Sequence, residues 1–341
     1  MTMRNFLIIT FLFFSWFSVA QVTPSVTIFT NYNYNNSPDS SVFADNYRGF
    51  QLERAYFGAK TNLSDNMSAG ILFDVGANSG GSSYTVFLKK AYAKWQYNED
   101  LSISMGLQST KQFSLLEKHW GFRYVEKSAQ DYFKFGASAD LGVTAVYSLK
   151  DNISFDVSVM NGEGYKNIQD ADGHFKTSMG VTFEPRGNFI IRGYCGREGF
   201  DRALWDTASS VLGANAVTKS IAIFYDNDKF SFGYERTTKK NNLNVKRDNY
   251  TLSSYYGSYS CANNLTFFVR ADDSNLGIED VNQYYWDGID YAVIGVEKTL
   301  AEGVKVAVNY KNKHHSRDSD LLLYDPVEEE NFVCLNLEIK F

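Results

Sequence analysis

The last eleven residues, 331–341, read NFVCLNLEIKF and alternate between apolar and mostly polar side chains. The odd positions from Val333 to Phe341 are apolar, and the even positions between them include Asn336 and Glu338. Successive side chains of a β-strand point to opposite faces of a sheet, so this segment is predicted to be a strand with one apolar and one polar face. The same alternation, without helical spacing, occurs at 101–108, 153–159, 230–235 and 304–310.

The connections between alternating segments differ in length in a regular way. Seven short turns are predicted at 63–66, 98–100, 150–152, 184–188, 226–228, 259–264 and 301–303. Eight long polar connections are predicted at 33–48, 76–83, 109–140, 162–174, 199–217, 237–248, 271–288 and 311–330. Short turns at one end and long loops at the other are typical of outer-membrane barrels. The sequence therefore predicts an all-β fold, a transmembrane antiparallel β-barrel of about 16 strands spanning residues 21–341.

Composition and the N-terminus narrow the class of protein further. The 341 residues carry 33 Lys+Arg against 39 Asp+Glu, a balance that argues against a nucleic-acid partner. Three cysteines far apart do not suggest a disulfide framework. Residues 1–20 place Arg4 before an apolar run at 6–17 and a small-x-small site at 18–20, which predicts a signal peptide, with a retained anchor as the alternative. No later apolar run is long enough for a membrane helix, so we expect export to a Gram-negative outer membrane.

The ends of the predicted strands suggest the partners of the barrel. Aromatic residues such as Trp95, Tyr147 and Phe189 lie beside the short turns, where an interface girdle is expected. The terminal Phe341 resembles the aromatic signature that outer-membrane barrels present to their insertion machinery. We therefore expect outer-membrane lipid, lipopolysaccharide and that machinery as partners. The acidic groups at 272–273 and 328–330 are assigned to outer loops, as solvated charge in preference to a cation bridge to lipopolysaccharide.

The polar face of the predicted strands would line the lumen, and its charges follow from the register. The inward basic residues are Arg54, Lys60, Lys90, Lys94, Lys176, Arg192, Arg270, Lys305 and Lys340. The inward acidic residues are Asp74, Asp156, Glu184, Glu235, Glu297 and Glu338. Nine basic against six acidic groups would favour anions, because wall charges bias which ions enter a pore. The alternative is a lumen whose charges pair with one another across strands.

The segment 109–140 differs from the other predicted loops. It carries many large apolar residues, among them Phe113, Trp120, Tyr124 and Phe135, interleaved with basic residues. A solvated loop tip would leave this apolar surface exposed, whereas folding into the lumen buries it against the wall. We expect loop 109–140 to fold inward, narrow the pore and present charge there, in preference to forming an outward cap.

Four short motifs resemble the phosphate-selective porin O and P family over about residues 48–165. They are LERAYFG at 52–58, GLQ at 106–108, SADLGV at 138–143 and NGEG at 161–164. The resemblance implies a sixteen-stranded, usually trimeric channel whose third long loop folds inward and whose basic residues guide anions. By that resemblance, the pore constriction candidates in loop 109–140 are Lys111, Lys118, Arg123 and Lys127. Unlike the family, the chain has no dense ladder of arginines along a strand pair.

Catalytic and metal-binding signatures are absent from the sequence. There is no Gly-x-Ser-x-Gly elbow and no His-Glu-x-x-His motif. The adjacent histidines His314 and His315 would point in opposite directions on an extended chain, so together they are a poor metal chelate. No cofactor, metal or enzymatic activity is expected. The predicted function is passive diffusion of small hydrophilic solutes through an outer-membrane porin, with a mild anion preference. The alternatives are a phosphate- or polyphosphate-selective channel, a plugged structural or receptor barrel, and an outer-membrane hydrolase built on His119 with Ser114 or on His174 with a nearby aspartate.

Overall fold

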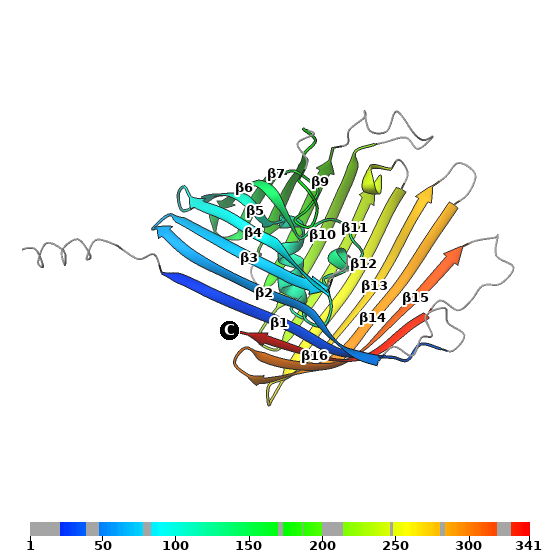
Figure 1. Ribbon diagram of the computed structural model, residues 1–341. Coiled ribbons are helices and arrows are strands. Elements are labelled where there is room, and N and C mark those ends of the chain that lie inside the picture. The colour runs from blue at the N-terminus through cyan, green and yellow to red at the C-terminus, as the bar shows by residue number, and fades with distance from the viewer. Residues whose placement is uncertain are drawn as a thin grey trace, which may run out of the picture.

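The computed structural model describes residues 21–38, 48–77, 83–169, 173–185, 187–199, 214–245, 248–279, 284–318 and 329–341. In these residues the chain forms a closed barrel of sixteen antiparallel strands, which confirms the predicted fold class (Figure 1). The strands are β1 Val22–Asn35, β2 Arg48–Ser64, β3 Met67–Ala77, β4 Tyr84–Gln96, β5 Leu101–Ser109, β6 Ala139–Leu149, β7 Ile153–Met160, β8 Lys176–Phe183, β9 Phe189–Glu198, β10 Ala216–Asp226, β11 Phe230–Lys240, β12 Asp248–Cys261, β13 Leu265–Glu279, β14 Tyr284–Ala301, β15 Val304–Asp318 and β16 Glu329–Lys340. The predicted signal peptide lies outside the described residues.

Each strand pairs with its neighbours in sequence, and β1 pairs with β16 to close the sheet. The alternation in β16 sets this closure. Val333 and Leu335 are 41% and 45% exposed on the outer face, whereas Cys334 and Asn336 are 2% and 1% exposed on the inner face. A one-residue slip would exchange the two faces, so the hydrophobic pattern fixes the register. Among the described residues, the structure contains no helix with the length and apolar character needed to cross a membrane.

The strands at one end of the barrel are longer than the sequence predicted. The expected loop at 271–288 is reduced to 280–283, because β13 runs to Glu279 and β14 begins at Tyr284. The placement of Asp272 and Asp273 in an outer loop was therefore wrong, since both lie within β13, where Asp272 is 4% exposed. The strand was missed because its outward positions there carry Asp273 and Asn275 in place of apolar residues. The same prediction was wrong for Glu329 and Glu330, which lie within β16.

Two β-bulges alter which side chains reach the lumen. In the β3–β4 pair, Leu72 is opposite Lys90 and Phe73 is opposite Leu88, so Lys89 is an extra residue in β4. Leu88 is exposed on the outer face, whereas Lys89 is buried toward the lumen beside Lys90. A bulge of this kind leaves one residue unpaired and redirects its side chain. A second register shift in the β1–β2 pair leaves Glu53 as the extra residue.

The segment between β5 and β6 lies inside the barrel. It contains the helix α2 Lys111–Trp120 and the short helix α3 Ala129–Tyr132, which Figure 1 shows within the ring of strands. Its large side chains pack against Phe29 of β1 and against the inner wall of β10–β15 in one hydrophobic cluster. The cluster is formed by Leu116, Trp120, Phe122, Tyr124, Val125, Ala129, Phe133 and Phe135 of the segment with Phe29, Ala222, Phe224, Leu252, Tyr256, Phe268, Ile289, Tyr291, Val293 and Ala307 of the wall. The apolar side chains of the segment are thus buried inside the barrel.

A glycine in β5 permits close approach to β4. Gly106 has φ of +117°, and a Cβ at this position would meet the Ala91 carbonyl oxygen and lie 2.9 Å from the Tyr92 Cα. We predict that Gly106→Ala lowers the free energy of unfolding by about 1–3 kcal/mol, because the residue would combine backbone strain with a steric clash. Gly193→Ala is the control, since a Cβ there meets nothing within 4 Å. Urea unfolding of the folded barrel in detergent, followed by tryptophan fluorescence, measures both; equal stabilities would contradict the prediction.

Candidate functional site

Arg270 of β13 anchors the inward segment to the wall. Its guanidinium donates to the main-chain carbonyl of Lys127 and forms an ion pair with Asp272 at 2.8 Å. The guanidinium carbon lies 5.0 Å from the ring centroid of Trp120, with the Tyr132 and Tyr291 rings at 5.9 Å and 5.4 Å. A buried guanidinium needs a counter-charge and hydrogen-bond acceptors for its N–H groups. Arg270 finds both in Asp272 and the Lys127 carbonyl, so it holds the segment against the wall and does not face open space.

Glu126 of the inward segment provides a second anchor, to the neighbouring strands β14 and β15. Its carboxylate accepts a hydrogen bond from Lys311 at 2.9 Å and from the Tyr291 hydroxyl at 2.7 Å. Burial would raise the pKa of Glu126, but Lys311 and Arg270 outweigh it and hold that pKa at about 2. A carboxyl with a depressed pKa stabilises the folded state above its ordinary pKa of 4.5, and this stabilisation is lost as the pH falls toward 2.

Three more of the wall charges that were predicted to line the lumen, Arg192, Glu235 and Glu297, also contact this segment. Glu235 accepts a hydrogen bond from Gln130 at 2.8 Å. Arg192 pairs with Asp156 at 2.6 Å and donates to the Lys111 carbonyl at 3.1 Å. Lys305 pairs at 3.1 Å with Glu297, which also accepts a hydrogen bond from the Tyr124 hydroxyl at 2.9 Å. On this side of the barrel Arg192, Arg270 and Lys305 each have a carboxylate partner, whereas Glu235 is held by the neutral Gln130 amide.

The open part of the lumen lies between the segment and the wall of β2–β4. A cavity of about 540 Å³ occupies this space. It is lined by six basic side chains, Arg54, Lys89, Arg123, Lys127, Lys134 and Lys166, and by two acidic side chains, Asp131 and Glu163. We call this space the eyelet. The excess of cations makes the eyelet electropositive.

Pairing within the eyelet is incomplete. Arg54 and Lys89 share Asp74, at 3.8 Å and 3.9 Å, and the Tyr165 hydroxyl also donates to this carboxylate at 2.6 Å. Arg123 lies 3.6 Å from Asp131. Within the described part of the chain, no carboxylate lies within 4 Å of the amines of the remaining three lysines, Lys127, Lys134 and Lys166.

Lys166 is held by aromatic rings in the eyelet, whereas burial and a neighbouring cation oppose its charge. Its amine lies over the rings of Phe87 and Tyr165, at 5.4 Å and 5.7 Å from their centroids. Burial lowers the pKa of Lys166, and the nearby Arg54 lowers it further. An anion in the eyelet would relieve this repulsion between like charges.

The four predicted constriction residues separate into two pairs. Arg123 and Lys127 line the eyelet. Lys111 lies in the first turn of α2 near Arg192, and Lys118 is exposed on α2, so neither belongs to the eyelet lining. The sequence reading missed Lys89 because the bulge in β4 is not visible in the alternation. The adjacent lysines at 89–90 were the only sign of this bulge in the sequence. The sequence analysis missed Lys166 because this residue comes from the next long connection, 162–174, and not from loop 109–140.

A second group of lysines lies on the β2–β4 wall. Lys60, Lys90 and Lys94 occupy inward positions of β2 and β4. Together with Lys111 of α2, they have no carboxylate within 4 Å among the residues that the structure describes. Arg54, Asp74, Lys90 and Lys94 therefore lie on the open side of the lumen, whereas Arg192, Arg270, Lys305 and Glu235 lie on the packed side.

The hydrolase alternative finds no support in the geometry around His119. Its Nδ1 pairs with the Asp226 carboxylate, and its ring stacks on Phe224 at 4.2 Å between centroids. Burial lowers the pKa of His119, and Asp226 opposes that effect. The Nε2 atom is buried without a hydrogen-bond partner in the described residues, so Ser114 does not contact it. The aspartates suggested for His174, at positions 170 and 172, lie outside the described residues.

Comparison with known proteins identifies the fold. OmpF of Salmonella typhi in complex with daunomycin superposes with a TM-score of 0.69 at 12% identity, covering 94% of this chain and 98% of that chain. An anion-selective porin from Comamonas acidovorans gives 0.67 at 12% identity over 94% and 100% of the two chains. OprB of Pseudomonas putida gives 0.68 at 9% identity over 94% of each chain. The chain has the outer-membrane porin fold.

Sequence comparison gives no finer assignment. No family model matches the chain, and no curated protein matches its sequence. Membership of the phosphate-selective porin O and P family therefore stays a prediction. The porin fold accounts for the closed sixteen-strand wall, and the chemistry of the pore rests on the residues of the eyelet.

The Glu126 anchor can be tested by removing its charge. We predict that Glu126→Gln weakens the attachment of residues 122–135 by roughly 3–5 kcal/mol, because it leaves the buried Lys311 without its counter-charge. Hydrogen–deuterium exchange should then be about 100-fold faster or more in that segment and unchanged in the strands. Glu302→Gln, the same substitution in an exposed turn, is the control. Unchanged exchange at 122–135 would show that apolar packing alone holds the segment.

Proposed function

We propose that this chain is an outer-membrane porin that admits small hydrophilic solutes by passive diffusion and favours anions mildly. The observation that carries the proposal is the lining of the eyelet, with six basic and two acidic side chains. Residues at a constriction act on a permeating ion at short range, where their charge is least screened. The eyelet thereby provides an anion bias even though the whole chain carries a net charge of −6.

The rest of the lumen supports this division of roles. Apolar packing and paired charges fill the side next to β10–β16, which confines solutes to the side next to β2–β4. The anchors Arg270, Glu126 and Arg192 hold the segment rigidly enough to keep the eyelet at a fixed size. Selection would therefore depend on the size of the eyelet and on the sign of its charge, without any chemical step.

Ion selectivity gives the direct test. We predict that Lys127→Glu combined with Lys166→Glu moves the reversal potential of single channels in a planar bilayer, under a salt gradient, from the anion side toward the cation side. The reason is that the two substitutions lower the net charge of the eyelet by four units without removing an ion pair. Lys118→Glu, on the same segment but outside the eyelet lining, is the control and should have a much smaller effect. An unchanged reversal potential in the double variant would exclude the eyelet as the selectivity element.

A phosphate- or polyphosphate-selective channel is the second candidate. The lysine group at positions 60, 90, 94 and 111 favours it, because several unpaired cations near one another suit a multiply charged anion. We predict that phosphate at millimolar concentration then reduces the chloride current, and that Lys90→Gln with Lys94→Gln relieves the block at least several-fold. Chloride current insensitive to phosphate in an open wild-type channel would leave the general porin as the function. Folded protein without conductance would favour the plugged barrel.

A further inference from the structure

One charged side chain faces the lipid in the part of the barrel nearest the short turns. On each strand that the structure describes, the first three outward positions from the short-turn end are uncharged, except on β14, where Lys298 is the second. Its outward neighbours are apolar, namely Val296 and Leu300 on β14, Leu265 on β13 and Val306 on β15. A cation on the lipid face of a barrel is destabilising in a depth-dependent way. Lys298 therefore stands out as a charge that needs a partner.

The barrel itself supplies no counter-charge for Lys298. Its amine donates to the main-chain carbonyl of Asn263 in the turn between β12 and β13. Among the described residues, no carboxylate lies within 4 Å of this amine, because Glu297 faces the lumen and pairs with Lys305, and Glu302 is exposed in the turn after β14. An ammonium carries three N–H donors, so two of those on Lys298 remain available for an anion.

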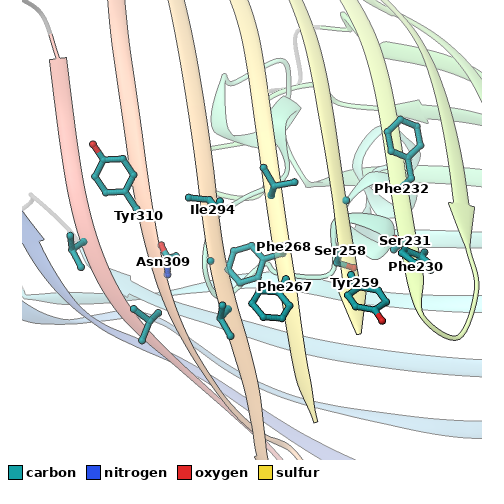
Figure 2. A pocket seen from close by; sticks show the side chains of 16 residues that line it. Phe230, Ser231, Phe232, Ser258, Tyr259, Phe267, Phe268, Ile294, Asn309 and Tyr310 are labelled. Carbon is teal, nitrogen blue, oxygen red and sulfur yellow. The ribbon is translucent and has the colours of Figure 1, made fainter. Parts of the chain in front are cut away.

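An apolar groove lies beside Lys298, toward the middle of the barrel. It has a volume of about 820 Å³ and crosses β11–β15 on the outer face, where Val296, the next outward residue after Lys298, is part of its wall. Gly257 of β12 leaves a gap between Phe232 and Val269, which are opposite it on the neighbouring strands. The missing side chain forms a recess in a wall that is otherwise covered by large apolar residues. Figure 2 shows these residues, from Phe230 and Tyr259 through Phe267 and Ile294 to Tyr310.

The distance between Lys298 and the recess fits within one leaflet of a bilayer. Ile294 of β14 lies in the same row as Gly257 and four residues from Lys298. Four residues span about 13 Å along a strand, and about 10 Å along the membrane normal for a strand tilted by about 40°. One leaflet provides about 15 Å of hydrocarbon, half of a core of about 30 Å. A lipid with its phosphate at Lys298 thus brings an acyl chain past Gly257 without leaving its leaflet.

We propose that Lys298 and the groove bind one anionic phospholipid of the periplasmic leaflet, with its phosphate on Lys298 and one acyl chain along the groove past Gly257. Short turns lie on the periplasmic side of outer-membrane barrels, so the site is in the leaflet opposite to lipopolysaccharide. An anionic headgroup fits better than a zwitterionic one, because the described surroundings of Lys298 offer no carboxylate to a second, cationic group. The site depends on the outer-membrane location and not on which solute crosses the lumen.

Native mass spectrometry of the folded, delipidated barrel in mild detergent tests the proposal. The protein is titrated with palmitoyl-oleoyl phosphatidylglycerol or with phosphatidylcholine that carries the same acyl chains. We predict one retained phosphatidylglycerol per chain, bound at least several-fold more tightly than phosphatidylcholine. Lys298→Gln should remove this preference, whereas Lys298→Arg should keep it, because a guanidinium also pairs with phosphate. Lys229→Gln, at an exposed lysine in the turn before β11, is the control and should bind as the wild type does.

Filling the groove completes the test. Val296→Trp places a large ring between Lys298 and the recess and should weaken both lipids at least several-fold, whereas Val157→Trp, at an exposed outward position of β7, should not. Phosphatidylglycerol with a diazirine on one acyl chain should label β11–β15 of the wild type. Heat-dependent gel mobility shows that each variant is folded. Equal binding of the two lipids would overturn the proposal, and so would a preference that Lys298→Gln leaves intact. Labels confined to other strands would also overturn it, since the groove would then be covered by something else.

Discussion

Closure of the sheet is the constraint on which the rest of the structure depends. A strand that crosses a bilayer cannot leave its main-chain donors and acceptors unpaired, and only a closed ring of strands pairs all of them. Here the ring closes where β1 meets β16, with the register set by the alternation in the last strand. Because the wall is closed, one face of every strand meets lipid and the other meets the lumen. Every further feature is a consequence of what occupies these two faces.

Inside the ring, ion pairs and apolar packing together divide the lumen into a packed side and an open side. Trp120, Tyr124 and their neighbours form a hydrophobic cluster with the wall of β10–β15, an arrangement usual in a soluble core but here placed inside a barrel. Arg270 and Glu126 fix the direction of the segment because each needs a partner that only one position supplies. The side of the lumen next to β2–β4 is left with cations that the packed side does not neutralise. The proposed anion preference of the eyelet thus arises because its lysines, unlike the cations on the packed side, are not all paired with carboxylates.

Outside the ring, the height of the apolar band varies around the wall. A barrel surrounded only by lipid would be expected to keep a band of uniform height, because hydrophobic mismatch carries a cost for each ångström. On β11 the outward Phe230, Phe232 and Tyr234 are followed by Arg236, so the apolar band is shorter there than on β3, whose outward positions from Met67 to Ala77 carry no charge.

The sequence by itself determined the barrel, its strand number and the separation of its two faces, because a period of two in hydrophobicity depends only on local chain geometry. It also predicted that loop 109–140 is too apolar to remain outside. It did not predict the extent of β13, because Asp273 and Asn275 occupy outward positions where an apolar residue was expected. It could not place Lys89, since one extra residue in β4 becomes visible only when β3 is laid beside it. Only the tertiary structure decided which charges anchor the segment and which remain available to solutes. The reason is that Arg270 and Glu126 bind partners, Lys127 and Lys311, that lie 143 and 185 residues away in the sequence.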